Sequence, residues 1–223
     1  MTRKRQTAPA AVLWDMDGTL VDTEPSWIAS EFALADRHGG RWTTEHALSL
    51  VGKDLLDAGR YIREHMGVDL TPERIVEEML DGVVAAIREH VPWRPGAVEL
   101  LATLRAAGVP CALVTMSYER LVAPIIEHLP AGSFQAVVTG DMLEQGKPHP
   151  EAYLTAAGAL GVAAEDCLAI EDSTTGVASA EAAGCTVLVV ENHVRVDPGP
   201  RRVFRDTLVD LTLEDLWVLA YGT

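Results

Sequence analysis

Residues 11–25 read AVLWDMDGTLVDTEP, in which four apolar residues are followed at once by a cluster of acids. The apolar run predicts a short buried strand over residues 11–14, which Gly18 ends. Asp15 and Asp17 then follow the end of a buried strand, where a carboxylate charge is costly unless another group compensates it. The function of the chain depends on what that group is.

Strand and helix patterns alternate after residue 92. Apolar runs joined by helical patterns and short connections predict further strands at residues 110–115, 134–139, 167–172 and 185–190. This alternation predicts an α/β fold, a Rossmann-like parallel sheet with helices on both faces, and the strand at 11–14 belongs to the same sheet. Residues 206–212 (DTLVDLT) predict a final edge strand, and residues 213–220 a closing helix.

Between these two parts, the pattern from Pro25 to about His90 is helical throughout. We therefore expect two domains: an α/β core made of residues 1–24 and 92–223, and an inserted all-α domain made of residues 25–91. The chain would enter and leave the insertion through residues 22–25 and 91–95.

Composition limits the classes of partner and compartment. The 223 residues include 18 Lys and Arg against 33 Asp and Glu, a net charge of −15, which argues against nucleic acid and anionic membranes as partners. Cys111, Cys167 and Cys185 are odd in number and lack metal-ligand spacing, which indicates reduced thiols in the cytoplasm. No apolar stretch is long enough to span a bilayer, and residues 1–10 do not resemble a signal peptide. A monomer is the default expectation.

Ligands of open parallel sheets bind beyond the carboxyl ends of the strands. Polar residues of this chain follow four predicted strands at that end. They are Asp15 and Asp17 after the first, Thr115 and Ser117 after the second, Lys147 in the loop after the third, and Glu171 and Asp172 after the fourth. The topology thus predicts that four separate segments deliver these groups to one edge of the sheet.

Asp15 and Asp172, brought together there, raise each other's pKa unless a cation lies between them. Hard oxygen ligands suit Mg²⁺, which leaves coordination positions for substrate oxygens. A metal held by Asp15, Asp172 and a group at Asp17 would compensate the buried charge and attract a phosphate. Asp15 could then act as the nucleophile and form an aspartyl-phosphate, while Asp17 acts as general acid and base.

Other residues at this edge suit the phosphate oxygens. Thr115 can donate a hydrogen bond, and Lys147 supplies the local positive charge that the overall charge of −15 seems to deny. Backbone N–H groups around Gly18, Met116 and Ser117 could complete a phosphate-binding cradle.

Four motifs in this order, DMDGTLVD (15–22), LVTMS (113–117), GKPHPE (146–151) and IEDSTTGV (170–177), resemble the signature motifs of the haloacid dehalogenase superfamily. The helical insertion resembles the α-helical cap of its β-phosphoglucomutase-like phosphatase group. The resemblance implies that Asp15 is nucleophile and Mg²⁺ ligand, and that Asp17 is the acid/base whose carbonyl also binds the metal. It places Thr115 and Lys147 on the phosphate, Asp172 as a direct metal ligand and Glu171 as a ligand acting through water. A structural charge at the next helix N-terminus is the alternative for Glu171.

The resemblance also narrows the reaction. Members that cleave carbon–halogen or phosphonate bonds lack the second aspartate, so Asp17 argues against both activities. Mutases of the group carry a histidine and a cap arginine where this chain has Trp27 and Leu55. Hydrolysis of a small phosphomonoester, such as a sugar phosphate, is therefore the expected function. A sugar-phosphate mutase, and a non-catalytic phosphate-binding module, remain the alternatives.

Specificity is expected from the insertion, because the edge of the sheet recognises only the phosphate. The candidates are Glu24, Trp27, Gly52, Lys53 and Asp54. For Lys53, a solvated position at the start of a helix is an equal alternative. Closure of the insertion over the site would exclude water, with hinges at residues 22–25 and 92–95.

Overall fold

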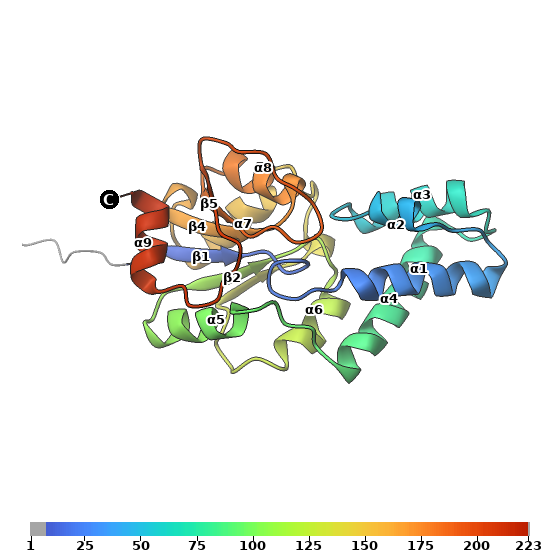
Figure 1. The fold of residues 1–223 in the computed structure, drawn as a ribbon, viewed down its shortest axis with the longest axis horizontal. Coiled ribbons are helices and arrows are strands. Elements are labelled where there is room, and N and C mark those ends of the chain that lie inside the picture. The colour runs from blue at the N-terminus through green and yellow to red at the C-terminus, as the bar shows by residue number, and fades with distance from the viewer. Residues whose placement is uncertain (1–7, 223) are drawn as a thin grey trace, which may run out of the picture.

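The computed structural model describes residues 8–222 and contains a parallel sheet of six strands in the order β3-β2-β1-β4-β5-β6 (Figure 1). All neighbouring pairs are parallel, which confirms the predicted class of fold. The strands are β1 (Ala11–Trp14), β2 (Cys111–Val114), β3 (Ala136–Val138), β4 (Cys167–Glu171), β5 (Thr186–Val189) and β6 (Arg202–Phe204).

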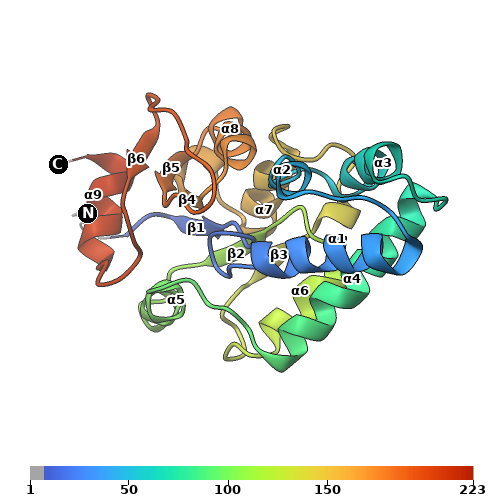
Figure 2. The ribbon, with the colours of Figure 1, turned by 45° about the vertical axis from the view of Figure 1, so that its right-hand side comes forward.

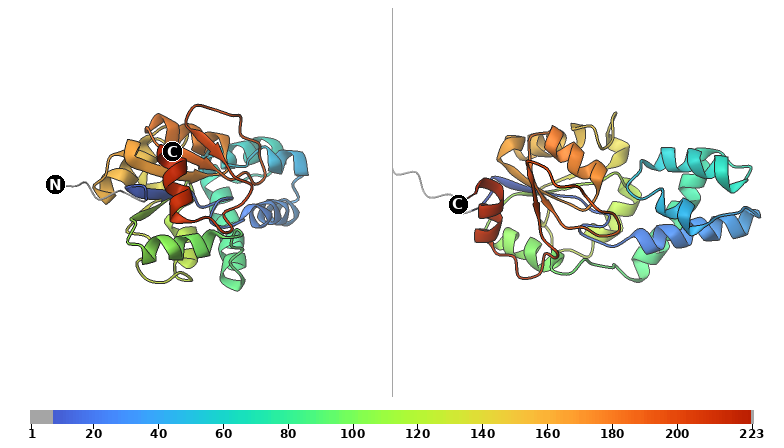
Figure 3. Two further views of the ribbon diagram at one scale, coloured as in Figure 1. Left: turned by 60° about the vertical axis from the view of Figure 1, so that its left-hand side comes forward. Right: turned by 45° about the horizontal axis from the view of Figure 1, so that its top comes forward.

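Helices cover both faces of the sheet because alternate strand residues point to opposite sides. Val12 and Trp14 of β1 pack with the helices of one face, and Ala11 and Leu13 with those of the other. The first face is covered by α5 (Ala97–Ala106), α6 (Glu119–Ile126) and α9 (Leu213–Tyr221), and the second by α7 (Glu151–Leu160) and α8 (Thr174–Ala182) (Figures 1 and 3). Two short 3-10 helices, η1 (Gly140–Met142) and η2 (Ala164–Asp166), complete the connections.

One strand differs from the sequence prediction. The edge strand is β6 (Arg202–Phe204), and residues 206–212 form an irregular segment rather than the predicted strand. The hydrogen bonds between β5 and β6 end with the N–H of Arg205, which donates to the carbonyl of Val189 (3.0 Å). The residues that pair with β5 therefore precede the predicted segment 206–212. Arg202 can occupy the sheet because Glu181 on α8 accepts hydrogen bonds from its guanidinium (2.6 and 3.0 Å). The predicted closing helix is confirmed as α9.

The insertion consists of four helices: α1 (Glu24–His38), α2 (Thr44–Leu48), α3 (Leu55–Met66) and α4 (Pro72–Glu89) (Figure 2). Sequence signals set their ends. Gly39 ends α1 in a left-handed conformation (φ 68°), and the Thr71 side chain accepts a hydrogen bond from the N–H of Arg74 at the start of α4. A separate cluster of buried apolar residues, including Leu34, Ile62 and Met79, holds these helices together.

The two segments that connect the insertion to the sheet lie side by side and are hydrogen-bonded to each other. The N–H of Asp22 donates to the carbonyl of Pro92 (2.8 Å), and the N–H of Arg94 donates to the carbonyl of Leu20 (3.0 Å). Helix α4 also packs against α6, where Arg120 forms ion pairs with the carboxylates of Glu77 and Asp81. The four helices therefore lie beyond the carboxyl ends of the strands, beside the predicted site (Figure 3). Within residues 8–222, none of the helices has the length and apolar character needed to cross a membrane.

Candidate active site

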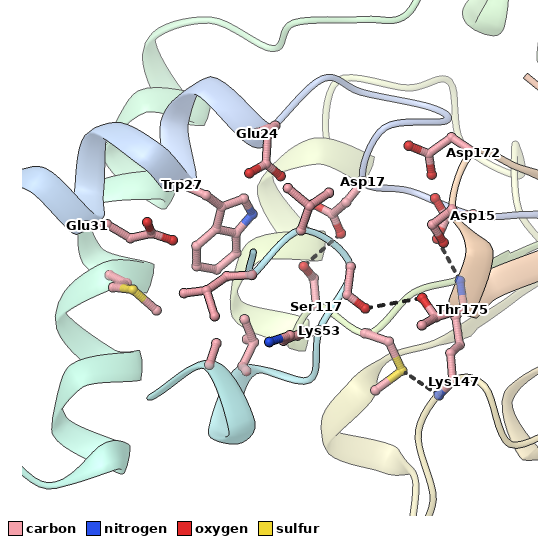
Figure 4. Close-up of a pocket in the computed structure, with 18 residues that line it drawn as sticks. Asp15, Asp17, Glu24, Trp27, Glu31, Lys53, Ser117, Lys147, Asp172 and Thr175 are labelled. Carbon is pink, nitrogen blue, oxygen red and sulfur yellow. Dashed lines mark hydrogen bonds and ion pairs between the residues drawn. The ribbon is translucent and has the colours of Figure 1, made fainter. Parts of the chain in front are cut away.

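A pocket lies between the strand ends and the inserted helices (Figure 4). It has two sides, which we call the strand-end wall and the helical wall. The strand-end wall is formed by Asp15, Asp17, Met116, Ser117, Lys147, Asp172, Ser173 and Thr175. The helical wall is formed by Glu24, Trp27, Glu31, Leu50, Val51, Gly52, Lys53, Leu55, Ala58 and Met79.

Lys147 is the centre of the strand-end wall. Its Nζ donates hydrogen bonds to Asp15 Oδ1 (2.6 Å), Glu171 Oε1 (2.7 Å) and the carbonyl of Val114 (3.0 Å), and its side chain is only 4% exposed. Burial lowers the pKa of Lys147, but the two carboxylates outweigh burial and the net direction is upward. The lysine is therefore a fixed positive charge that joins segments more than 130 residues apart along the chain.

One positive charge does not satisfy the three buried acids. Asp15 Oδ2 and Asp172 Oδ1 are buried without a hydrogen-bond partner among the described residues. Burial, followed by the charge of Glu171, raises the pKa of Asp15 to about 7, and burial and Asp15 hold the pKa of Asp172 well above its usual range. Because unpaired buried carboxylates are unfavourable, a further cation between Asp15 and Asp172 would stabilise their ionised forms.

The donor set fits a hard divalent ion. Oxygens of Asp15, Glu171 and Asp172 lie within 4.8 Å of one another, and carboxylate oxygens are the ligands that Mg²⁺ prefers. Glu171 is already occupied: besides Lys147, it accepts hydrogen bonds from the hydroxyl of Tyr153 (2.7 Å) and from the N–H of Asp172 (3.1 Å). Asp15 and Asp172 are thus the two acids with oxygens left for a metal.

Asp17 lies closer to the pocket opening and is held by hydroxyl groups. Thr23 donates to Asp17 Oδ1 (2.5 Å), while Thr115 (3.0 Å) and Ser117 (2.8 Å) donate to Asp17 Oδ2. The Thr115 hydroxyl, predicted to donate to a phosphate, and the Ser117 hydroxyl both orient Asp17 in this structure. Two residues that follow β2 therefore position Asp17, which follows β1.

Two N–H groups of the predicted backbone cradle make hydrogen bonds within the protein. The N–H of Gly18 donates to the carbonyl of Val21 (2.7 Å), and the N–H of Ser117 donates to Thr115 Oγ1 (2.9 Å). In this conformation, neither group is available to a phosphate. Gly18 has another role, because a Cβ at this position (φ 93°) would meet Asp172 Oδ2 at 2.0 Å. Met116 lines the pocket, and its Sδ accepts a hydrogen bond from the N–H of Lys147 (3.3 Å).

On the helical wall, the predicted residues Glu24, Trp27, Gly52 and Lys53 all line the pocket. Asp54 is a correction: it does not line the pocket, and its carboxylate caps α3 by accepting hydrogen bonds from the N–H groups of residues 56 and 57.

Among the residues of the site that the sequence interpretation missed, Glu31 and Tyr153 show two different causes. Glu31 lies on the same face of α1 as Glu24 and Trp27, and the spacing of three and then four residues could have revealed it. Tyr153, which binds Glu171, carried no such signal because it depends on the packing of α7 against the sheet.

Comparison with known proteins agrees with this geometry. A family model described as haloacid dehalogenase-like hydrolase matches residues 12–190. Hexitol phosphatase A of Escherichia coli (strain K12) is 34% identical over 209 residues, covering 92% of this chain and 90% of the relative. Phosphoglycolate phosphatase 1 of Pseudomonas aeruginosa is 33% identical over 221 residues, covering 93% of this chain and 78% of the relative. The solved structure of CbbY from Rhodobacter sphaeroides in complex with phosphate aligns with a TM-score of 0.82 at 26% identity, covering 91% of this chain and 96% of that one.

Proposed function

We propose that this chain, which belongs to the haloacid dehalogenase-like hydrolases, is a Mg²⁺-dependent phosphatase. Its substrate would be a small organic phosphomonoester, such as a sugar phosphate. The observation that carries the proposal is the pair of buried, unpartnered oxygens of Asp15 and Asp172 beside Lys147. The family relationship and the phosphatase names of the relatives support the same reaction.

Asp15 and Asp172 would hold the Mg²⁺ ion, with the carbonyl of Asp17 as a further ligand, and Glu171 acts indirectly through Lys147. When bound, the ion would supply positive charge for the phosphate oxygens and for the two acids. Lys147 neutralises charge on the same side of the pocket throughout the reaction.

The chemistry uses two aspartates in sequence. A carboxylate oxygen of Asp15 attacks phosphorus, the ester P–O bond breaks, and the leaving oxygen takes a proton from Asp17. Asp17 then takes a proton from a water molecule, which attacks the phosphorus of the aspartyl-phosphate. Inorganic phosphate leaves and the Asp15 carboxylate is regenerated. Thr23, Thr115 and Ser117 position Asp17 through their hydroxyl groups.

Residues 25–91 would act as a cap over this site, moving relative to the core formed by residues 1–24 and 92–223. The paired crossings at Asp22–Pro92 and Leu20–Arg94 support hinges at residues 22–25 and 92–95. The closed cap would exclude water from the aspartyl-phosphate until the leaving group departs.

Phosphoryl return to a sugar has little support from the pocket. Trp27 and Leu55 line the helical wall at the positions where the mutase pattern requires a histidine and an arginine. Neither side chain can transfer a proton as a histidine does, and neither carries the positive charge with which an arginine binds a second phosphate. A mutase would need both a bisphosphate activator and an isomerised product, so product analysis separates the two reactions.

We further propose that the protein works as a cytoplasmic monomer without nucleic-acid or membrane partners. The buried free thiols of Cys111, Cys167 and Cys185 and the net charge of −15 support this view. Light scattering of the purified protein measures the oligomeric state, and a dimer mass would contradict the proposal.

Turnover of p-nitrophenyl phosphate tests the proposed reaction. We expect turnover with Mg²⁺. The activity should be lost when EDTA is added and should recover when Mg²⁺ is restored in excess. The Asp36→Asn variant, which removes an exposed acid of α1 outside the pocket, serves as control and should match the wild type. Turnover that persists unchanged in EDTA would contradict the metal requirement.

A further inference from the structure

The helical wall carries acids that the proposed chemistry does not use. Glu24, Trp27 and Glu31 follow one another along one face of α1 and face the same pocket as Lys147 and Asp15 (Figure 4). A phosphate held at the strand-end wall would therefore direct the rest of its substrate toward these residues.

Glu31 is buried and only partly satisfied. Glu31 is 4% exposed, and its Oε2 accepts a hydrogen bond from Nε1 of the buried Trp42 (2.8 Å). Among residues 8–222, no group donates a hydrogen bond to its Oε1, and no cation pairs with it. A carboxylate has room for about four hydrogen bonds, so Glu31 presents unused acceptor capacity to the pocket.

Glu24 lies about two helical turns before Glu31 on the same helix and is only partly buried. It lines the pocket, and within the described part of the chain its carboxylate has no hydrogen bond or ion pair. Burial raises the pKa of Glu24 and of Glu31 to about 7, although His193 lowers that of Glu24 and the hydrogen bond from Trp42 lowers that of Glu31. The nearest lysine on this wall, Lys53, lies over the ring of Tyr61 at 5.0 Å from the ring centre.

These features select the chemistry of the occupant. At pH 8, above the raised pKa of both acids, hydroxyl groups can donate to the two carboxylates, whereas a carboxylate or second phosphate of the substrate cannot donate and would be repelled by them. Between the acids, Trp27, Leu50 and Met79 offer apolar surface to carbon–hydrogen groups. An uncharged chain bearing several hydroxyl groups satisfies both requirements, and an acid-bearing phosphate such as phosphoglycolate satisfies neither.

We propose that Glu31, together with Glu24, binds the hydroxyl groups of a polyol chain whose phosphate lies at the strand-end wall. The substrate class is then the monophosphates of polyhydroxylated chains, hexitol phosphates among them, rather than phosphorylated carboxylic acids, and the assignment rests on the phosphatase function proposed above. Glu31 is then a specificity residue, which contacts the substrate away from the reacting phosphorus.

The test compares three substrates on the purified full chain with Mg²⁺: sorbitol 6-phosphate, phosphoglycolate and p-nitrophenyl phosphate. The wild type should prefer sorbitol 6-phosphate to phosphoglycolate. The Glu31→Gln variant, which keeps the shape of the side chain and turns an N–H₂ donor toward the pocket, should lose about tenfold in kcat/KM for sorbitol 6-phosphate, mainly through KM. It should gain several-fold for phosphoglycolate and stay within about twofold for p-nitrophenyl phosphate. Asp36→Asn should change none of these values.

An equal loss on all three substrates would overturn the proposal, because Glu31 would then be structural. An unchanged ratio of sorbitol 6-phosphate to phosphoglycolate would also overturn it. If the proposed phosphatase function itself is wrong, the wild type will not turn over p-nitrophenyl phosphate, and this result is distinct from the two above. Calorimetric binding of both natural phosphates to an Asp15→Asn protein, with and without Glu31→Gln, measures the same preference without turnover. Equal affinities in both proteins would again overturn the proposal.

Discussion

On the strand-end wall, Lys147 binds the carboxylates of Asp15 and Glu171, whereas on the helical wall no cation among residues 8–222 pairs with Glu24 or Glu31. The first arrangement joins the ends of β1, β2 and β4 and ties them to α7 through Tyr153. The second depends on a single helix, α1, and one hydrogen bond from Trp42. In the proposals above, the charges at the strand ends serve the metal and the phosphate, and the acids of α1 bind the uncharged part of the substrate.

The largest expected effect concerns the strand-end wall. Asp15→Asn removes the proposed nucleophile and one metal ligand while conserving side-chain volume. We expect p-nitrophenyl phosphate turnover to fall at least about 10³-fold, because the loss of a nucleophile removes the covalent route. Steady-state kinetics measures this, with Asp36→Asn, an exposed acid of α1 outside the pocket, as the matched control. Residual activity above a tenth of the wild-type value would show that Asp15 is not the attacking group.

Lys147→Met should have the largest effect on stability. It removes the buried partner of Asp15 and Glu171, and uncompensated buried acids typically cost about 3–5 kcal/mol. Urea unfolding in EDTA should report a free energy of unfolding lower by about this amount, with part of the loss recovered in excess Mg²⁺. A change below about 1 kcal/mol would mean that the strand ends do not depend on this lysine.

Glu31→Gln should raise the free energy of unfolding at neutral pH, whereas Lys147→Met lowers it. Burial raises the pKa of Glu31 from 4.5 to about 7, so between these values the folded state holds a proton that the unfolded state has lost. The wild type therefore loses stability as the pH rises from about 4.5 to about 7, and the variant does not incur this loss. We expect the variant to gain up to about 3 kcal/mol relative to the wild type between pH 4.5 and pH 8.

Urea unfolding of both proteins at the two pH values measures this difference, in which the other titrating groups cancel. Asp36→Asn should not change with pH in this way, since its side chain is exposed. A pH-independent difference between Glu31→Gln and the wild type would contradict an uncompensated charge on the helical wall.

The smallest expected effect lies where the two parts meet at their rim. Arg120 pairs with Glu77 and Asp81, but all three side chains are substantially exposed. Because exposed ion pairs contribute roughly 0–1 kcal/mol, Arg120→Ala should lower the free energy of unfolding by less than about 1 kcal/mol and change KM by less than about threefold. Thermal unfolding and kinetics measure both. A tenfold fall in kcat would instead make these ion pairs part of cap closure.

The sequence predicted the sheet well where local patterns were strong. β1, β2, β4 and β5 are apolar runs with turn residues on both sides, and the chain order of their polar ends identified the edge of the sheet. β6 was misplaced because it is only three residues long and arginines stand within and beside it, at positions 201, 202 and 205, as in a solvated loop. Its backbone pairing with β5 and the ion pair of Arg202 with the distant Glu181 leave no local signal.

The site shows the same division. Asp15, Asp17, Lys147 and Asp172 could be named because each follows a strand directly or stands in a motif. The partners of these residues could not: the Tyr153 hydroxyl reaches Glu171 only through the packing of α7, and Thr115 and Ser117 hold Asp17 across two strands. Glu31 could have been found from its helical spacing to Glu24 and Trp27, although its burial by Trp42 could not.

Mg²⁺ binding tests the central claim most directly, namely that Asp15 and Asp172 share one ion. Isothermal titration of the metal-free protein with Mg²⁺ should give one site per chain, and Asp172→Asn should weaken it by at least about tenfold while Asp36→Asn leaves it unchanged. Equal affinity for Mg²⁺ in the wild type and in Asp172→Asn would contradict the account.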